Sequence, residues 1–373
     1  MFRSSLKPIV RPVSTVFVAM LVLGAGVFPA AAAVRQASHA RAPQVSATSC
    51  SSTAVCEVLA VNGSRPEILG TTNSGTTWKV QSVPKSVFTL SGISCPSTTT
   101  CFVGAAGASA PAVLATTNGG RSWTVQHLPT AMYGAFGISC HSTTTCEVVG
   151  DTDAGSVPTG FVAGTTTGGK SWKTQVIPSG QGKLYAVSCA SATTCVATGL
   201  YGAASVSHAA TVLGTTNGGS LWKSQTAPTG IVVGSSLSCP TPSVCEGVGE
   251  SATLATEVIG TIDGGGIWKA RTLPSTKDVL EGVSCKYSSS CEAAVQDRKS
   301  FTSTSGLVLV TSTLGGSWVQ HPLPTADHAP SSISCVSAKV CELVGNNSTS
   351  SGDVGFVLRT KNGGKTWTTQ ELP

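Results

Sequence analysis

Short apolar segments alternate along the chain with turns rich in Gly, Ser, Thr and Pro. In residues 137–150, GISCHSTTTCEVVG, an apolar strand ends at a cysteine, a five-residue polar turn follows, and a second strand leaves the next cysteine. A variable segment precedes a third apolar strand such as AVLATT at 112–117, and a Gly-rich turn then leads to a fourth strand opened by Trp, as in SWKTQVIP at 171–178. This order predicts four antiparallel strands per unit.

Cysteine and tryptophan set the period of the repeat, which is 45–50 residues. Each cysteine has a partner six positions away, giving Cys50/Cys56, Cys95/Cys101, Cys140/Cys146, Cys189/Cys195, Cys239/Cys245, Cys285/Cys291 and Cys335/Cys341. One tryptophan falls in each unit, at Trp78, Trp123, Trp172, Trp222, Trp268, Trp318 and Trp367. Repeats of this length made of short strands are typical of propellers. We therefore predict an all-β, seven-bladed β-propeller with one four-stranded antiparallel blade per repeat, residues 45–50 supplying the first inner strand.

The N-terminus has the features of a secretory signal. Arg3, Lys7 and Arg11 precede the apolar run VFVAMLVLGAGVF at 16–28, and small residues follow up to Ala33. The run is short for a transmembrane helix, so we expect cleavage rather than an uncleaved anchor. This predicts a signal peptide at 1–33, a short leader at 34–45, a single propeller at 46–373, and a secreted protein that has no membrane span after cleavage.

Composition narrows the classes of function. The chain is 40% hydrophobic and 11% charged, which excludes a disordered polyelectrolyte. Beyond residue 33, 20 Lys and Arg face 17 Asp and Glu. So small a net charge predicts no nucleic-acid or polyanion partner. We further expect a monomer.

The seven cysteine pairs fit disulfides within hairpins, since each pair flanks a turn and follows a secretory signal. Zinc sites favour ligand pairs closer in sequence, and no histidine recurs beside these cysteines. Redox catalysis would favour one special site over seven equal copies. We therefore expect structural disulfides, no metal and no cofactor.

The turn before each Trp, as in TTNGGRSW at 116–123, resembles the Asp-box, or bacterial neuraminidase repeat, S-x-D-x-G-x-T-W. The resemblance covers all seven units and implies a propeller similar to the photosystem II stability/assembly factor group. The Asp position holds Asn in four copies and Asp only at Asp263. This drift favours a structural turn, in which Asn118 bonds locally and tolerates a left-handed backbone, Gly119 supplies positive φ, and Trp packs between blades.

The hairpin pattern places the cysteine turns and the Gly turns on one face of the disc, which we call the disulfide face. Binding residues are expected on the opposite face, where the variable loops and the linkers after each Pro differ between units. Aromatic residues on consecutive linkers suggest a ligand patch, and polar residues of nearby loops extend it. The candidates are Phe88, Tyr133, Phe136, Lys183, Tyr185, His208, Asp278, Glu281 and Arg298. The alternative interpretation is that the aromatics fill the mouth of the inner channel.

Glutamate follows the second cysteine in five units. These residues are Glu57, Glu147, Glu246, Glu292 and Glu342. They could form a cation-attracting ring on the disulfide face, but we favour a half-exposed strand position that tolerates Glu.

Two functions fit these observations. The first is a secreted, non-catalytic scaffold that binds an unknown protein or glycan, because no isolated catalytic constellation is present. The second is a sialidase-like or other glycoside hydrolase on the same kind of propeller. A sialidase would carry a FRIP-type phrase and three convergent arginines, and the phrase is missing. Asp151, Asp153, Asp278 and Glu281 are the acids open to a two-carboxylate mechanism.

Overall fold

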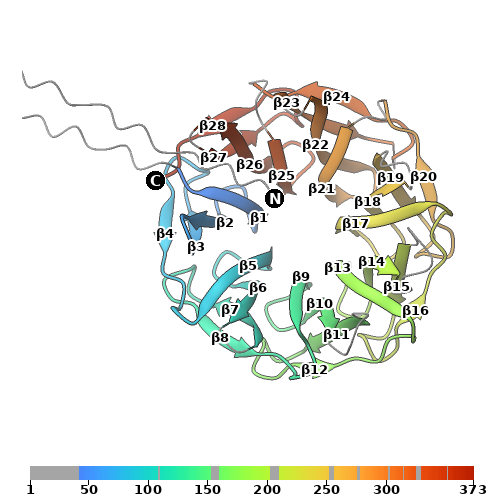
Figure 1. The fold of residues 1–373 in the computed structure, drawn as a ribbon. Coiled ribbons are helices and arrows are strands. Elements are labelled where there is room, and N and C mark those ends of the chain that lie inside the picture. The colour runs from blue at the N-terminus through green and yellow to red at the C-terminus, as the bar shows by residue number, and fades with distance from the viewer. Residues whose placement is uncertain are drawn as a thin grey trace, which may run out of the picture. The chain divides into compact units, whose positions relative to one another are not determined.

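The computed structural model describes residues 42–107, 110–152, 159–201, 210–251, 256–274, 278–300, 303–313, 315–324, 329–350 and 352–373. These residues belong to one compact unit, Ala40–Pro373. They form seven four-stranded antiparallel sheets, each from four consecutive strands, arranged as blades around a centre (Figure 1). The predicted seven-bladed β-propeller is confirmed. The predicted signal peptide and most of the predicted leader lie outside the described residues.

Each blade contributes one strand to each of four layers. The inner strands are β1 (Gln44–Cys50), β5 (Val87–Ser94), β9 (Gly134–Cys140), β13 (Gln181–Cys189), β17 (Ile231–Ser238), β21 (Asp278–Tyr287) and β25 (Ala329–Cys335). The second strands are β2 (Cys56–Asn62), β6 (Cys101–Gly107), β10 (Cys146–Thr152), β14 (Cys195–Tyr201), β18 (Cys245–Ser251), β22 (Ser290–Ser300) and β26 (Cys341–Thr349). The third strands are β3 (Arg65–Thr71), β7 (Pro111–Thr116), β11 (Thr159–Thr165), β15 (Ala210–Thr215), β19 (Thr256–Thr261), β23 (Ser303–Thr311) and β27 (Gly352–Thr360). The outer strands are β4 (Lys79–Gln81), β8 (Thr124–His127), β12 (Lys173–Thr174), β16 (Lys223–Ser224), β20 (Lys269–Arg271), β24 (Val319–Pro322) and β28 (Thr368–Gln370).

The core lies between blades and consists mainly of the second and third strands. Their side chains are apolar on both faces, as in CEVVG and FVAGT, because each sheet packs against a neighbour on either side. Val149 and Val162 of blade 3 (β9–β12), for example, pack with Leu184 and Trp222 of blade 4 (β13–β16). The outer strands are short and exposed, which limits edge-to-edge pairing with other molecules.

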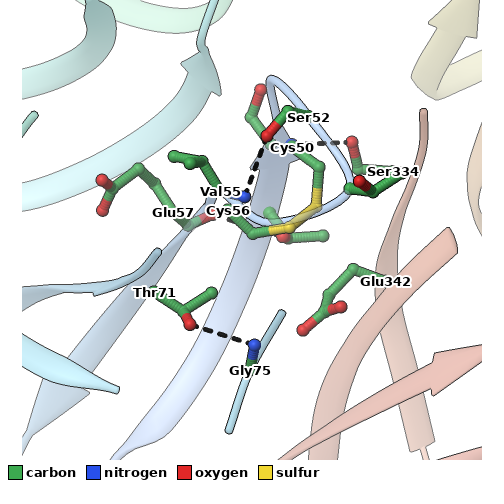
Figure 2. Close-up of a disulfide and its surroundings, with 12 residues drawn as sticks. Cys50, Ser52, Val55, Cys56, Glu57, Thr71, Gly75, Ser334 and Glu342 are labelled. Carbon is green, nitrogen blue, oxygen red and sulfur yellow. Dashed lines mark hydrogen bonds between the residues drawn. A yellow bond between two sulfur atoms is a disulfide. The ribbon is translucent and has the colours of Figure 1, made fainter. Parts of the chain in front are cut away.

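Seven disulfides close the hairpins between the inner and second strands, one per blade, with the predicted pairing. In each of the seven blades a serine precedes the first cysteine, and its Oγ accepts a hydrogen bond from the first cysteine N–H of the following blade. These bonds are 2.9–3.0 Å long. Figure 2 shows the bond from Cys50 to Ser334, which joins the first blade to the last. Disulfide and serine together fix the register of each blade against the next.

The second cysteine of every pair is buried, so these residues belong to the core and offer no surface for a ligand. The exposed fraction is 1% for Cys56, Cys146, Cys245, Cys291 and Cys341, and 3% for Cys101 and Cys195. Cys291, for example, packs with Val295 and Trp318 in the cluster between blades 5 and 6. The predicted structural role of the disulfides agrees with this burial.

The hairpin of blade 6 departs from the prediction of a turn that spans all residues between the two cysteines. The inner strand β21 continues past Cys285 to Tyr287, and β22 begins at Ser290, one residue before Cys291. Tyr287 pairs with Ser290, so the connection is tighter than in the other blades, where the second strand begins at the cysteine itself. Tyr favours extended backbone, and no other unit has an aromatic residue in this turn. The predicted disulfide is unchanged, but the predicted start of the strand at Cys291 is wrong by one residue.

The Gly-rich turns between third and outer strands are held by their own side chains. Asn118 Oδ1 accepts hydrogen bonds from the Thr116 hydroxyl and the Ser122 N–H, at 2.9 and 3.1 Å. Gly119 and Gly120 have φ of 68° and 75°, conformations that glycine adopts without strain. The predicted local bonding of Asn118 is confirmed. Gly119 has the predicted positive φ, and Gly120 adopts one as well.

Each tryptophan covers a blade boundary. Trp172 is 8% exposed, and its indole Nε1–H donates to Gln126 of the preceding blade at 3.2 Å. The same bond joins Trp78 to Gln370, Trp123 to Gln81, Trp222 to Gln175, and Trp268 to Gln225. Arg271 and His321 replace the glutamine at the two other boundaries. All seven tryptophans are buried, and in five blades the indole also hydrogen-bonds to the neighbouring blade.

The ring closes without exchange of a strand, since blade 1 contains β1–β4 and blade 7 contains β25–β28. Asn346 acts here as a backbone mimic. Its Oδ1 accepts from the Val45 N–H at 2.9 Å, and its Nδ2 donates to the Val45 carbonyl at 2.8 Å. The first and last blades are thus joined by the hydrogen bonds of the Asn346 amide, of Ser334 and of Trp78.

We expect Trp172→Ala to lower the free energy of unfolding by roughly 3–5 kcal/mol, because it opens a cavity at a blade boundary. Trp172→Phe keeps most of the packing but loses the bond to Gln126, and should cost less. Urea denaturation under non-reducing conditions measures both. A change near zero for Trp172→Ala would show that the indole does not stabilise the boundary.

Candidate functional site

The inner strands of all seven blades line a central channel with a volume of about 450 Å³. One wall is apolar and aromatic, with Phe136 and Tyr185 from blades 3 and 4. Across the ring, blades 6, 7 and 1 contribute Glu281 together with Ser331, Ser332 and Thr48, whose hydroxyls are hydrogen-bonded to backbone groups. The channel therefore has an aromatic side opposite a side of small polar residues and one glutamate.

Phe136 and Tyr185 form a stacked pair, with ring centroids 5.5 Å apart and planes at 29°. Lys183 Nζ lies 5.8 Å from the Phe136 centroid and 2.9 Å from Asp151 Oδ2. Asp151 is buried, and its hydrogen bond raises the pKa of Lys183. The ion pair and the cation–π contact hold the aromatic wall in place across the boundary between blades 3 and 4.

Tyr133 extends this cluster outward. Its N–H donates to the Asp151 carbonyl at 2.8 Å, while its side chain is 62% exposed. An aromatic ring fixed by its backbone and open to solvent is a typical ligand contact. We call Tyr133, Phe136, Asp151, Lys183 and Tyr185 the aromatic cluster.

The structure brings together only some of the residues that the sequence suggested. Tyr133, Phe136, Lys183 and Tyr185 belong to the aromatic cluster, and Glu281 lines the channel. Phe88 lies on β5 and is 59% exposed. Asp278 and Arg298 belong to β21 and β22, but their side chains lie outside the described part, as does the whole of His208.

The five glutamates after the second cysteine are buried, so neither a surface ring of carboxylates nor a half-exposed strand position is correct. Their exposed fractions are 0–4%. Burial comes from the next blade: Glu342, for example, lies beside the Cys50–Cys56 disulfide of blade 1 (Figure 2). A single repeat does not contain this information, because the covering atoms belong to another repeat.

Burial raises the pKa of Glu57 and Glu147 to about 7, although each accepts a hydrogen bond from a glutamine of its own blade, Gln81 or Gln175. Glu246 and Glu342 instead pair with Arg271 and Arg359, at 2.6 and 2.9 Å. There burial raises the carboxyl pKa and the guanidinium opposes the rise.

Glu292 of blade 6 differs from the other four. Its carboxylate has no hydrogen-bond partner, and burial alone raises its pKa to about 7. The glutamine position is His321, and Val310 stands opposite Glu292 where blades 1, 3 and 5 have glycine. The bulkier valine occupies the space that Gln81 uses in blade 1.

Two positions that recur in the repeat were not predicted to be structurally important. The glutamine three residues after Trp and the serine before the first cysteine both make contacts between blades. Alignment of the seven units by column would have shown both. Among the described residues, the groups of potential metal ligands contain disulfide-bonded cysteines, which cannot coordinate as thiolates.

Seven four-stranded antiparallel blades around a central channel define the chain as a seven-bladed β-propeller. No protein-family model matches the sequence, and comparison with curated proteins finds no match. YCF48 from Cyanidioschyzon merolae has a similar structure, with a TM-score of 0.60, 14% identity, and coverage of 86% of this chain and 96% of that one. The fold is thus similar to that of the photosystem II stability factor group.

The GH74 xyloglucanase from Xanthomonas campestris also has a similar structure, with a TM-score of 0.62 at 10% identity. The match covers 89% of this chain but 55% of the xyloglucanase, so this chain spans about half of that protein. Identities this low show a shared fold and no more. In the described part of the chain, no helix has the length and apolarity to cross a membrane.

The buried glutamates predict a stability that falls as pH rises. Between pH 4.5 and about 7 the folded chain holds a proton on Glu292 that the unfolded chain releases. The contribution of Glu292 to the free energy of unfolding is therefore most favourable below pH 4.5 and decreases as the pH rises through 7. The difference in the free energy of unfolding between Glu292→Gln and the parent protein should therefore change with pH. It should shift in favour of the variant by on the order of 3 kcal/mol between pH 5 and pH 8.

Denaturation at both pH values measures this gain, and the exposed Glu371→Gln is the matched control. An equal effect of Glu292→Gln at pH 5 and pH 8 would contradict a protonated Glu292.

Proposed function

We propose that this chain is an exported, non-catalytic β-propeller that binds a protein or glycan through the face formed by its variable loops and linkers. The observation that carries the proposal is the aromatic cluster at the boundary between blades 3 and 4. It combines a stacked pair, a buried ion pair and the 62% exposed Tyr133. Exposed aromatics on a rigid base are the usual anchors of binding surfaces.

Export is supported by the seven disulfides, which form in oxidising compartments. The signal-like segment at 1–33 would supply the route. Within this proposal, the turns that resemble Asp-boxes are architectural elements.

The carboxylates support binding rather than hydrolysis. Raised carboxyl pKa values often mark general acids, but five of them here belong to glutamates buried at one repeated position of the sheets. The sixth belongs to the half-buried Glu257 on β19, where partial burial raises the pKa. Asp151 is occupied by Lys183. Glu281 is the one carboxylate among the described residues that line the channel, whereas glycoside hydrolysis normally requires two.

A glycoside hydrolase is the alternative, and the fold shared with a xyloglucanase gives it a specific basis. Loss of glycoside turnover on Glu281→Gln would establish it, because Glu281 is the acid that lines the channel in the described part of the chain.

The test is a glycan-array screen of the oxidised protein, with hydrolysis of fluorogenic sialosides and mixed glycosides measured on the same sample. We expect binding without turnover, and about tenfold weaker binding for Tyr133→Ala. Val80→Thr changes an exposed outer-strand residue and serves as the control. Binding that Tyr133→Ala leaves unchanged would refute the role of the aromatic cluster.

A further inference from the structure

The face opposite the aromatic cluster carries basic charge. It is formed by the Gly turns, the disulfide turns and the first residues of the outer strands, and we call it the turn face. Six basic side chains lie in the turns: Arg121, Lys170, Lys286, Lys339, Lys361 and Lys365. Four more follow the tryptophans: Lys79, Lys173, Lys223 and Lys269. All ten are exposed.

Acidic residues hardly balance this charge. Asp263 is the one exposed carboxylate within the described turns, and the exposed Glu371 lies beside the Gly turns of blades 1 and 7. The five glutamates at this end of the blades are buried. At the other end both signs occur, with Glu67, Asp151 and Asp353 near Arg65, Lys85 and Lys183. The small net charge of the chain therefore conceals a basic face.

The turn face is also level. Every Gly turn has six residues between the third-strand threonine and Trp, and every pair of cysteines encloses five. Within a blade the two turns are tied together, as by the bond from the Gly119 N–H to the Thr99 carbonyl at 2.9 Å. From these equal lengths, with the tighter hairpin of blade 6 as the exception, we infer that the turns end at about the same height and that the turn face can lie against a plane.

Apolar side chains project from one sector of this face. Leu221, Ile262, Ile267 and Tyr287 belong to the consecutive blades 4, 5 and 6, and are 47%, 60%, 59% and 53% exposed.

The repeat shows that folding does not require the apolar tips. Leu221 and Ile267 occupy the position before Trp, where the other five units have Ser or Thr. In blades 1 and 2 that hydroxyl accepts a hydrogen bond from the turn asparagine, Asn73 or Asn118, at 2.9 and 2.8 Å. Leu and Ile cannot accept such a bond and gain no burial in return.

We propose that the turn face docks on an anionic lipid bilayer, with Leu221, Ile262 and Ile267 entering the headgroup region and the surrounding lysines contacting lipid phosphates. Each basic residue near an anionic membrane contributes about 1 kcal/mol, and the attraction is screened by salt. A bilayer can bury the exposed apolar side chains, whereas a soluble polyanion cannot, so these side chains favour a bilayer as the partner. In this arrangement the aromatic cluster faces away from the membrane.

The test is co-sedimentation of the mature, oxidised protein with vesicles of phosphatidylglycerol and phosphatidylcholine, compared with pure phosphatidylcholine. We expect binding only to the anionic vesicles, with loss in about 0.5 M salt. Lys170→Gln, Lys173→Gln, Lys223→Gln and Lys269→Gln combined should weaken partitioning at least tenfold, because each removes an attraction to the anionic lipids. Leu221→Ser with Ile267→Ser should weaken it about tenfold while restoring the residue type of the other blades.

Matched controls lie on the opposite face. Arg65→Gln with Lys85→Gln and, separately, Val61→Thr should leave vesicle binding unchanged. Equal binding of the parent protein and the Leu221/Ile267 variant would refute insertion. Sedimentation with neither vesicle type, or a polyphosphate affinity that matches the vesicle affinity, would overturn the proposal. Because the aromatic cluster is not altered, these outcomes are independent of ligand binding there.

Discussion

The hydrogen bond from the first cysteine N–H of one blade to the serine Oγ of the preceding blade is the contact on which the ring depends. It occurs at all seven boundaries, including Cys50 with Ser334 at the closure. A closed ring requires each blade to fit two neighbours, and a slip of one residue would turn the apolar side chains of a strand to its other face. The adjacent disulfide fixes the hairpin that carries the serine. The disulfide that closes each hairpin and the hydrogen bond that joins two blades thus involve neighbouring residues.

Departures from the repeat are concentrated in blades 5 to 7. Arg271 and His321 replace the glutamine that receives the tryptophan, while Val310 and Arg359 replace the glycine opposite Glu292 and Glu342. Arg271 and Arg359 form ion pairs with Glu246 and Glu342. Arg271 stands where a glutamine would accept from Trp318, and both the Trp318 indole and the Glu292 carboxylate have no hydrogen-bond partner. Buried polar atoms without partners cost stability, so this sector is the least optimised part of the ring.

Features contained within one repeat could be predicted from the sequence, whereas features shared between repeats could not. The four strands, the disulfides and the turn at Asn118 follow from local pattern, since each uses atoms of one hairpin. Burial of Glu57 or Glu342 depends on the next blade. The aromatic cluster joins Phe136 and Asp151 to Lys183 and Tyr185 across a boundary.

The distribution of charge shows most clearly why a repeat protein should be analysed by column, that is, by comparing the equivalent positions of its repeats. A lysine after Trp is unremarkable in one unit, but the ring places every copy of that column on the same face, and four copies carry it. The glutamate column lies at the same end of the blades but is buried, so it does not neutralise the lysines. Summing charges along the chain cancels groups that the fold keeps apart. The electrostatic character of each face is set by which columns are exposed, and only the packing of one blade on the next decides that.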